Sequence, residues 1–463
     1  MTSTRDTPVV ILSNRGPLSF SVSGDTIVAR RGSGGLVSGL VPLLELGRAT
    51  WTAAAMGDAD RAAIDRDGIV RGEGIEARLL DIDEEVMRRY YDEISNSTLW
   101  FVHHGLYDRV RAPAFDAQWW DAWRSYREVN EVFARSVIEH APEGARVLVQ
   151  DYHLSLVARG ARRVRGDLSF VHFHHTPFAG PEDFAVLPPE VRAELLEGLA
   201  SHDACGFHTA RWEANYRDTA QRFGDAGAST VVSTFVSTLN SDLDGLRGVA
   251  SGEQSRSARA ELEAIAGDRV VIARVDRMEL SKNIVRGFDA FDRMLELRPE
   301  LRGHVVFLAC CYPSRLGVAD YRRYHDDVLR SVERINQRWG DQRWQPIHLF
   351  TEDDFPRSVA LMQIYDVLVV NPIRDGLNLV AKEGPALNER NGSLVLSSEA
   401  GAYAELNSAC DAVFPFDIEQ TAHALMAAVD RDGEERVLRA RSLVALVAAR
   451  TPADWLADQL AAG

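Results

Sequence analysis

Six short apolar runs in this 463-residue chain end in polar side chains of the types that bind phosphate groups and sugar hydroxyls. Arginine, lysine, histidine and aspartate recur directly after these runs, in both halves of the chain. If the runs are parallel strands, their carboxyl ends meet at one edge of a sheet, where open α/β sheets bind ligands. The residues are Asn14 and Arg15, Asp151 and His153, His174 and His175, Asp276 and Arg277 with Lys282, Ser314 and Arg315, and Arg374 and Asp375.

The charge of the chain limits what these residues can bind. The formal net charge is -16, so an anion is attracted only where positive charge is concentrated locally. Arginine binds phosphate through two parallel hydrogen bonds, and lysine acts on phosphate as a point charge. The pattern favours a cleft between two domains that holds phosphate groups, with ordinary salt bridges from Arg277 and Lys282 to Asp276 and Glu279 as the alternative.

Lysine is rare in this chain. Of the 52 basic residues, only Lys282 and Lys382 are lysines. A genome-wide drift from lysine to arginine explains most of this bias, but it does not explain why two lysines remain. Both lie in segments with other chemically suggestive residues, which favours a functional requirement for each.

Two glycine-containing segments could bring backbone N–H groups close to a ligand. The first, residues 31–36, precedes a predicted helix but matches neither the GxGxxG nor the P-loop pattern. The second begins at Asp375 and Gly376 and leads into another predicted helix. There Asp375 could accept hydrogen bonds from sugar hydroxyls, and Glu383 could accept a pair from a ribose.

The apolar runs alternate with helical patterns, which predicts an α/β fold with doubly wound parallel sheets. The segment 245–267 is rich in Ser, Gly, Glu and Arg and marks a predicted domain boundary near 240–250. We therefore expect a first domain at 1–245, a second at 246–440, and a terminal helical segment at 441–463 that packs back on the first domain. The predicted strands are 9–13, 147–151, 168–173, 270–276, 304–311, 367–371 and 394–397, and the predicted helices are 123–139, 190–202, 284–297 and 358–365.

The composition excludes several classes of protein. Acidic residues outnumber basic ones by 68 to 52, which argues against nucleic acid or an anionic membrane as the main partner. The four cysteines form no CxxC pair, and the histidines at 172, 174 and 175 lack neighbouring ligands, so no metal site is predicted. The short N-terminal apolar run is unlike a signal peptide, and a cytoplasmic protein is expected.

Taken together, the motifs resemble those of the trehalose-6-phosphate synthases, retaining glycosyltransferases with two Rossmann-like domains in the GT-B arrangement. The similarity extends in order across almost the whole chain, and the segment 374–383 is its most specific part. The matching stretches are 13–15, 34–37, 91–100, 151–154, 175–178, 206–209, 275–277 with Lys282, 313–315 and 374–383.

The resemblance implies a role for each matching residue, with the first domain binding the acceptor and the second the nucleotide sugar. It implies that small-molecule substrates are the partners, and it leaves a homo-oligomer open. The implied catalytic residues are Arg277, Lys282, Asp151 and His175; the implied donor-binding residues are Gly35, Asp375, Gly376, Leu377, Asn378, Leu379 and Glu383; and the implied acceptor-binding residues are Arg15, Tyr91, Trp100 and Arg315.

The implied reaction transfers glucose from a nucleotide-glucose to the C1 hydroxyl of glucose 6-phosphate with retention at the anomeric carbon. No carboxylate stands out as a nucleophile for double displacement, so we expect front-face departure of the leaving phosphate. Arg277 and Lys282 then stabilise the charge that grows on the leaving phosphate. Neither a metal nor another cofactor is expected.

Departures from the family pattern bear on which nucleobase and which sugar the substrates of this protein carry. Residues 236–240 read Val-Ser-Thr-Leu-Asn where the family has Pro-Ile-Gly-Ile-Asp, and Asn283 replaces a glycine. These changes resemble a divergent actinobacterial branch and favour GDP-glucose over UDP-glucose. The alternative is a pseudo-glycosyltransferase that joins a nucleotide-cyclitol to a phosphorylated aminocyclitol. A catalytically silent sensor is disfavoured because Arg277, Lys282 and Glu383 are all retained.

Overall fold

The computed structural model describes residues 7–24, 26–32, 35–45, 47, 49–224 and 232–463. The chain divides into two compact units. The first unit comprises residues 1–239 together with 452–463, and the second comprises residues 240–451.

The sheet of the first unit is built around β1 (Val9–Leu12), an apolar strand whose four residues are all buried. The strand order is β10-β9-β8-β7-β1-β4-β6-β5, and the described pairs are parallel except β5 with β6. In register, Leu12 lies opposite Val149, and Gln150 lies opposite Phe173, so the polar residues that follow these strands share one edge. The other strands are β4 (Ala49–Ala54), β5 (Ile69–Gly72), β6 (Ile75–Leu80), β7 (Arg146–Gln150), β8 (Ser169–His174), β9 (Ala204–Phe207) and β10 (Ser233–Val236).

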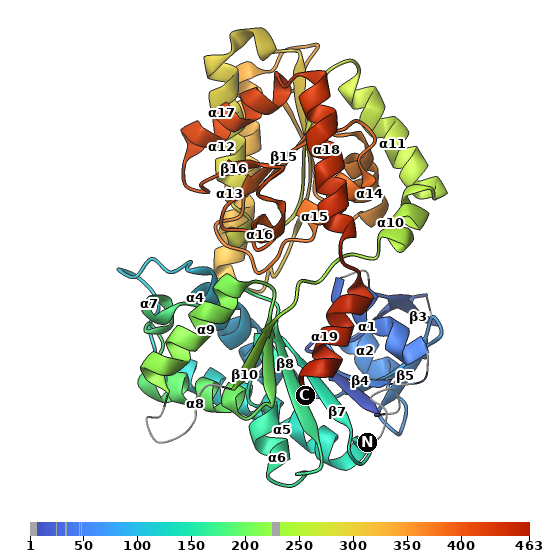
Figure 1. The fold of residues 1–463 in the computed structure, drawn as a ribbon, viewed down its shortest axis with the longest axis vertical. Coiled ribbons are helices and arrows are strands. Elements are labelled where there is room, and N and C mark those ends of the chain that lie inside the picture. Colours follow the sequence, from blue (N-terminus) through green and yellow to red (C-terminus); the bar gives the residue numbers. More distant parts are fainter. Residues whose placement is uncertain (1–6, 25, 33–34, 46, 48, 225–231) are drawn as a thin grey trace. The chain divides into compact units, whose positions relative to one another are not determined.

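Helices cover the sheet of the first unit. The terminal helix α19 (Pro452–Ala462) packs against α1 (Gly35–Glu45) and β8 (Figure 1), and its Trp455 is completely buried. The long helix α5 (Ala117–His140) packs against α6 (Val157–Arg162) and the π-helical segment Arg89–Leu99. The remaining elements are α2 (Asp58–Ala63), α3 (Glu84–Arg88), α4 (Trp100–His104), α7 (Pro181–Phe184), α8 (Pro189–Ala200), α9 (Ala210–Phe223) and the antiparallel hairpin β2 (Leu18–Ser23) and β3 (Thr26–Arg31).

The second unit contains a parallel sheet in the order β13-β12-β11-β14-β15-β16. Its longest strands, β11 (Val270–Met278) and β12 (Val305–Pro313), pair along their full length, with Asp276 opposite Cys311 and Met278 opposite Pro313. The segments that follow these two strands carry Lys282 and Arg315 and therefore start from the same edge. The other strands are β13 (Ile347–Phe350), β14 (Val367–Val370), β15 (Ser393–Ser397) and β16 (Asp411–Val413).

The second unit encloses an apolar core to which α12 (Ile284–Leu297), α13 (Ala319–Trp339) and α17 (Ile418–Val429) contribute. Phe288 and Phe291 of α12 meet the ring of Phe307 edge-on at centroid distances of 5.2 and 5.3 Å, a favoured aromatic geometry. A second group of helices packs in the pairs α11 with α14 and α15 with α18. Its members are α10 (Leu243–Ala250), α11 (Glu253–Ala266), α14 (Phe355–Ile364), α15 (Val380–Leu387) and α18 (Gly433–Ala448), and the short α16 (Tyr403–Leu406) follows β15.

The structure corrects the sequence prediction at the domain boundary. The polar segment 245–267 is not a linker but lies in α10 and α11, and Asp242 caps α10 by accepting a hydrogen bond from the backbone N–H of Gly245. Most of the Ser, Glu and Arg residues in this segment are exposed or partly exposed on these helices, whereas Ser255 is buried. The division falls at 239/240 rather than 245/246, and of the predicted terminal segment 441–463 only α19 belongs to the first unit.

We expect Trp455→Ala to destabilise the first unit by about 3–5 kcal/mol, the usual loss when a buried tryptophan is truncated. The ring of Trp455 meets Phe173 edge-on at 5.2 Å, and a Cβ at Gly39 would lie 3.0 Å from it, so the site is tightly filled. Urea unfolding followed by circular dichroism measures the loss. Trp120→Ala, at a partly exposed position of α5, is the size-matched control, and an equal loss in both variants would contradict the prediction.

Candidate functional site

The first unit carries Arg15 directly after β1, and a buried network fixes its backbone. Trp51 Nε1 donates a hydrogen bond to Ser13 Oγ (2.7 Å), and Ser13 Oγ donates to the carbonyl of Arg15 (2.6 Å). Arg15 Nη2 donates to the hydroxyl of Tyr91 at 3.3 Å, and the guanidinium carbon lies 5.8 Å from the centre of the tyrosine ring. The structure therefore brings together the first two predicted acceptor residues, which are 76 positions apart.

Tyr91 lies in the π-helical segment, and Trp100 begins the α-helix that follows it. Such wide turns often occur at functional sites because they redirect side chains. The ring of Tyr91 stacks on His153 at a centroid distance of 6.1 Å. Trp100, the third predicted acceptor residue, is buried and stacks on His104 at 3.9 Å.

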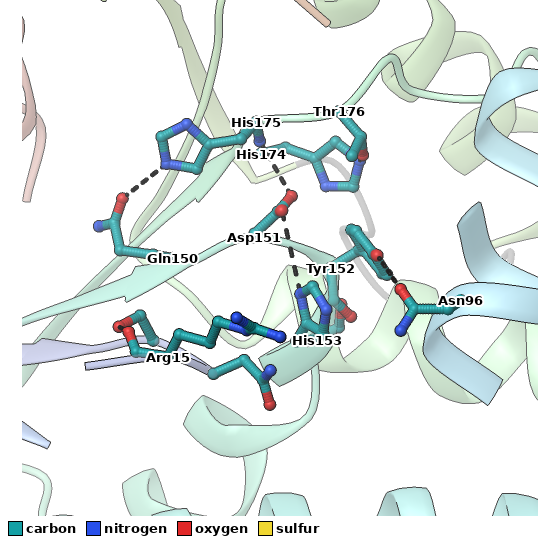
Figure 2. A network of polar contacts seen from close by, with 12 residues as sticks. Arg15, Asn96, Gln150, Asp151, Tyr152, His153, His174, His175 and Thr176 are labelled. Atoms are coloured by element: carbon teal, nitrogen blue, oxygen red, sulfur yellow. Dashed lines mark hydrogen bonds and ion pairs between the residues drawn. The ribbon is translucent and has the colours of Figure 1, made fainter. Parts of the chain in front are cut away.

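Asp151 occupies a strained position at the end of β7. Its φ of 70° lies in the region that non-glycine residues rarely adopt, and such strain occurs preferentially at functional sites. One carboxylate oxygen accepts a hydrogen bond from the backbone N–H of His175 (3.1 Å), and the other lies 3.9 Å from Nδ1 of His153 (Figure 2). Asp151 thus links the ends of β7 and β8.

Both ring nitrogens of His175 have protein partners. Its Nε2 lies 2.9 Å from Oε1 of Gln150, and its Nδ1 lies 3.2 Å from Nε2 of His208. The amide nitrogen of Gln150 donates to Gln459 on α19 (3.0 Å), so its oxygen faces Nε2 of His175. Burial lowers the pKa of His175 to about 3, which keeps the imidazole neutral. Sequence reasoning missed Gln150 and Gln459 because their hydrogen bond joins positions 309 apart.

In the second unit, β11 carries a buried ion pair. Arg274 Nε donates to Asp276 at 2.9 Å, and Arg274 Nη2 donates to the carbonyl of Lys282 at 2.6 Å. Burial raises the pKa of Asp276, although Arg274 and Lys282 oppose this effect. Arg274 therefore fixes the loop that presents Lys282.

Lys282 and Asp375, predicted for different parts of the donor, form an ion pair with 2.6 Å between Nζ and Oδ2. The same carboxylate oxygen accepts from Nδ2 of Asn378 at 3.1 Å. Burial disfavours the charged ammonium, yet Asp375 and Asp276 outweigh it and hold the pKa of Lys282 above its ordinary value. The lysine is therefore charged at neutral pH and is held at the start of the segment 375–379.

Glu279 is a completely buried carboxylate beside two predicted site arginines. Its Oε1 lies 2.9 Å from Nη1 of Arg277 and 4.0 Å from Nε of Arg315, and it accepts a hydrogen bond from Ser314 Oγ at 3.2 Å. Arg315 also donates to the hydroxyl of Tyr321 at 2.8 Å and has a φ of 53°. Of the salt bridges considered from the sequence, the one between Arg277 and Glu279 is present, whereas Asp276 pairs with Arg274.

The segment 375–379 is held by the loop that follows β15. Asp375 donates its N–H to the carbonyl of Glu399 (3.1 Å), and Gly401 donates to the carbonyl of Asp375 (3.0 Å). A Cβ at Gly401 would lie 2.0 Å from the carbonyl oxygen of Gly376, so only glycine fits there. Helix α15 begins immediately after Leu379 and carries Glu383 in its first turn.

Glu383 is buried, and burial raises the pKa of its carboxyl. Ser241, the second residue of this unit, donates a hydrogen bond to Oε1 of Glu383 at 2.6 Å. Sequence reasoning missed Ser241 because no local pattern connects it with α15.

Lys382, the second of the two lysines, has a structural position. Its Nζ is fully buried and contacts Asn240 Oδ1 at 2.8 Å and Glu405 at 2.9 Å. Nδ2 of Asn240 in turn donates to the carbonyl of Val447 at 2.6 Å. Lys382 thus connects α15 with Asn240 at the start of the second unit and, through Asn240, with Val447 near its end.

Gly35 is the first residue of α1, whereas Ser33 and Gly34 of the predicted phosphate loop lie outside the described residues. Arg15, Tyr91, Asp151 and His175 follow strand ends or pack beside them in the first unit, and the corresponding edge of the second unit carries Arg277, Lys282, Arg315 and Asp375. No helix in the described part of the chain is long and apolar enough to cross a membrane.

Two units with parallel α/β sheets, whose strand ends carry arginine, lysine, histidine and aspartate side chains, and the match to solved trehalose-6-phosphate synthase structures define the GT-B fold class. The chain matches the model of glycosyltransferase family 20 over residues 7–462, and it belongs to this family.

Curated relatives and solved structures agree with this assignment. The chain is 34% identical over 96% of its length to the trehalose-6-phosphate synthase of Mycolicibacterium smegmatis, covering 90% of that protein. It is 33% identical over 97% of its length to the bifunctional trehalose-6-phosphate synthase/phosphatase of Thermoproteus tenax, of which it spans 62%.

Among solved structures, an alpha,alpha-trehalose-phosphate synthase (UDP-forming) from Burkholderia vietnamiensis superposes with a TM-score of 0.84 at 28% identity, covering 98% of this chain and 99% of that one. The E. coli protein bound with UDP-2-fluoro glucose gives a TM-score of 0.84 at 25% identity, with coverage of 98% and 99%. The enzyme from Burkholderia xenovorans in complex with glucose-6-phosphate gives 0.82 at 26% identity, with coverage of 97% and 98%.

Because several histidines of the first unit are buried, we expect its free energy of unfolding to decrease as the pH is lowered. Burial lowers the pKa of His175 to about 3 and of His202 to about 4, and it also lowers those of His172 and His174. Below about pH 6.5 the unfolded chain binds protons that the folded chain excludes, so the free energy of unfolding drops by up to about 1.4 kcal/mol per pH unit for each histidine.

Urea unfolding between pH 7.5 and 4.5 measures this slope. We expect His202→Asn to make the slope shallower than that of the parent protein. His423→Asn, which replaces an exposed histidine, is the control. The prediction fails if the slope of His202→Asn equals that of the parent.

Proposed function

We propose that the protein is a trehalose-6-phosphate synthase, which transfers glucose from a nucleotide-glucose to the C1 hydroxyl of glucose 6-phosphate with retention. The family match over residues 7–462 carries this proposal. It is supported by the names of the curated relatives and by the solved relatives with UDP-2-fluoro glucose or glucose-6-phosphate bound. The local chemistry agrees, because cations and hydroxyl-binding carboxylates gather at strand ends in both units.

The donor is assigned to the second unit. Arg277 and Lys282 bind its diphosphate, the segment from Asp375 to Leu379 binds its glucose, and Glu383 accepts the ribose hydroxyls. The ion pair between Lys282 and Asp375 supports this assignment, since it fixes a phosphate-binding cation beside a hydroxyl-binding carboxylate. Ser241 and the ribose hydroxyls would then both donate hydrogen bonds to the carboxylate of Glu383.

The acceptor is assigned to Arg15, Tyr91, Trp100 and Arg315, with Arg15 and Arg315 on its 6-phosphate. Trp100 is buried at the start of α4, directly after the segment that carries Tyr91. Asp151 lies near the acceptor sugar in this proposal, and His175 lies near the 6-hydroxyl of the donor glucose. Because both ring nitrogens of His175 have protein partners, the sugar would have to share one of them.

For the chemical step we propose front-face substitution. The bond between the glucose C1 and the leaving phosphate oxygen breaks, the bond from C1 to the acceptor oxygen forms on the same face, and the acceptor proton passes to the leaving phosphate. Arg277 and Lys282 stabilise the negative charge on that phosphate. Two fixed cations perform the task that a metal ion performs elsewhere, so we propose that no cofactor is needed and that EDTA leaves the rate unchanged.

We expect substitution of Lys282 to affect turnover and substitution of Lys382 to affect stability. Lys282→Met should lower turnover by about 10²–10³-fold, the usual effect of removing one preorganised charge from a transition state. Lys382→Met should instead lower the free energy of unfolding by about 1–3 kcal/mol, because Asn240 is left buried without its donor. Steady-state rates and urea unfolding of both variants test the pair, and near-normal turnover of Lys282→Met would remove that lysine from the site.

We expect a turnover assay that pairs GDP-, UDP- and ADP-glucose with glucose 6-phosphate to yield trehalose 6-phosphate. The departures at 236–240 and at Asn283 favour GDP-glucose, whereas the names of several solved relatives specify UDP. Proton NMR of the product distinguishes the α,α-linkage expected for retention from the product of inversion. Absence of product with all three donors would overturn the proposed function.

A further inference from the structure

Glu279 stands out because the resemblance gives it no role, yet it contacts two residues that have one. Its side chain is completely buried, while that of its partner Arg277 is 43% exposed. A carboxylate at a phosphate-binding surface would repel the ligand, but a buried one behind an exposed guanidinium orients that group.

We propose that Glu279 is the positioning residue that sets Arg277 and Arg315 for the two phosphorylated substrates. This inference rests on the proposed function, which assigns Arg277 to the donor diphosphate and Arg315 to the acceptor phosphate. One oxygen of Glu279 faces both guanidinium groups, at 2.9 Å and 4.0 Å. The same carboxylate therefore serves both substrates.

The surroundings of Glu279 support a positioning role. Its Oε1 accepts a hydrogen bond from Ser314 Oγ, so the segment after β12 is tied to the end of β11. Arg315 has a left-handed backbone and a hydrogen bond to Tyr321, which direct its guanidinium. The charge of Glu279 also helps to keep Lys282 protonated, so the carboxylate acts on a third cation of the same cluster.

The alternative is that Glu279 only balances buried charge. Asp411 provides the comparison, because it pairs with Arg431 at 2.6 Å and with Arg439 at 3.1 Å in the same unit, and none of these residues has a predicted role. Asp411→Asn is therefore the matched control for the loss of a carboxylate that holds two arginines.

The test compares Glu279→Gln with Asp411→Asn. Glutamine keeps the acceptor for Ser314 but loses the charge that orients the arginines. We expect Glu279→Gln to raise KM for both glucose 6-phosphate and the nucleotide-glucose and to lower kcat, with a combined loss of about 10²-fold, as is typical when binding groups shift slightly. Asp411→Asn should leave these constants unchanged even where it lowers stability.

A double-mutant cycle tests whether Glu279 acts through Arg315. If it does, adding Arg315→Lys to Glu279→Gln raises KM for glucose 6-phosphate by less than the product of the single effects. Multiplicative effects, or kinetics of Glu279→Gln that match those of Asp411→Asn, would overturn the inference.

Titration calorimetry with inorganic pyrophosphate keeps this inference separate from the proposed function. Weaker binding to Glu279→Gln than to Asp411→Asn supports the positioning role, whether or not the parent protein forms trehalose 6-phosphate. Equal binding to both variants argues against it. Failure of the parent protein to form product in the turnover assay overturns the function alone.

Discussion

The candidate site of this acidic protein depends on ion pairs between carboxylates and the cations at its strand ends. With a net charge of -16, the chain can attract phosphate only where positive groups are concentrated. In the second unit each of these cations has a carboxylate partner: Arg274 with Asp276, Arg277 with Glu279, and Lys282 with Asp375. These pairs fix the cations before any ligand arrives, so little reorganisation is needed on binding.

The first unit differs, because beside the charged Arg15 and Asp151 it holds a network of neutral side chains around His175. His175 is kept neutral by burial and contacts the amide of Gln150, which Gln459 on α19 holds by a hydrogen bond. The last helix of the chain therefore helps to determine the hydrogen bonding of a residue after β8. Helix α19 belongs to the first unit, although it follows the second in sequence, because its buried Trp455 also packs on Phe173 of β8.

Much of the fold could be predicted from the sequence. The continuous apolar runs predicted the central strands of both sheets to within about two residues, since strands covered on both faces consist mostly of apolar residues. Strands such as β6 and β9 were missed because alternation with Arg and Glu, or the presence of Gly, hides their pattern. The division at 239/240 falls next to the predicted range of 240–250, whereas the polar segment 245–267 that suggested it lies in helices, because a solvated helix and a linker have similar compositions.

The sequence by itself determined the glycosyltransferase family, the α/β class and the residue types at the strand ends, because these depend on local order and spacing. Only the tertiary structure decided how those residues pair: that Asp375 holds Lys282, that Glu279 holds Arg277, and that Lys382 anchors a helix. Pairing depends on side chains from distant strands and loops meeting in a low-dielectric interior. The spacing of residues along the chain does not show which of these side chains will contact each other.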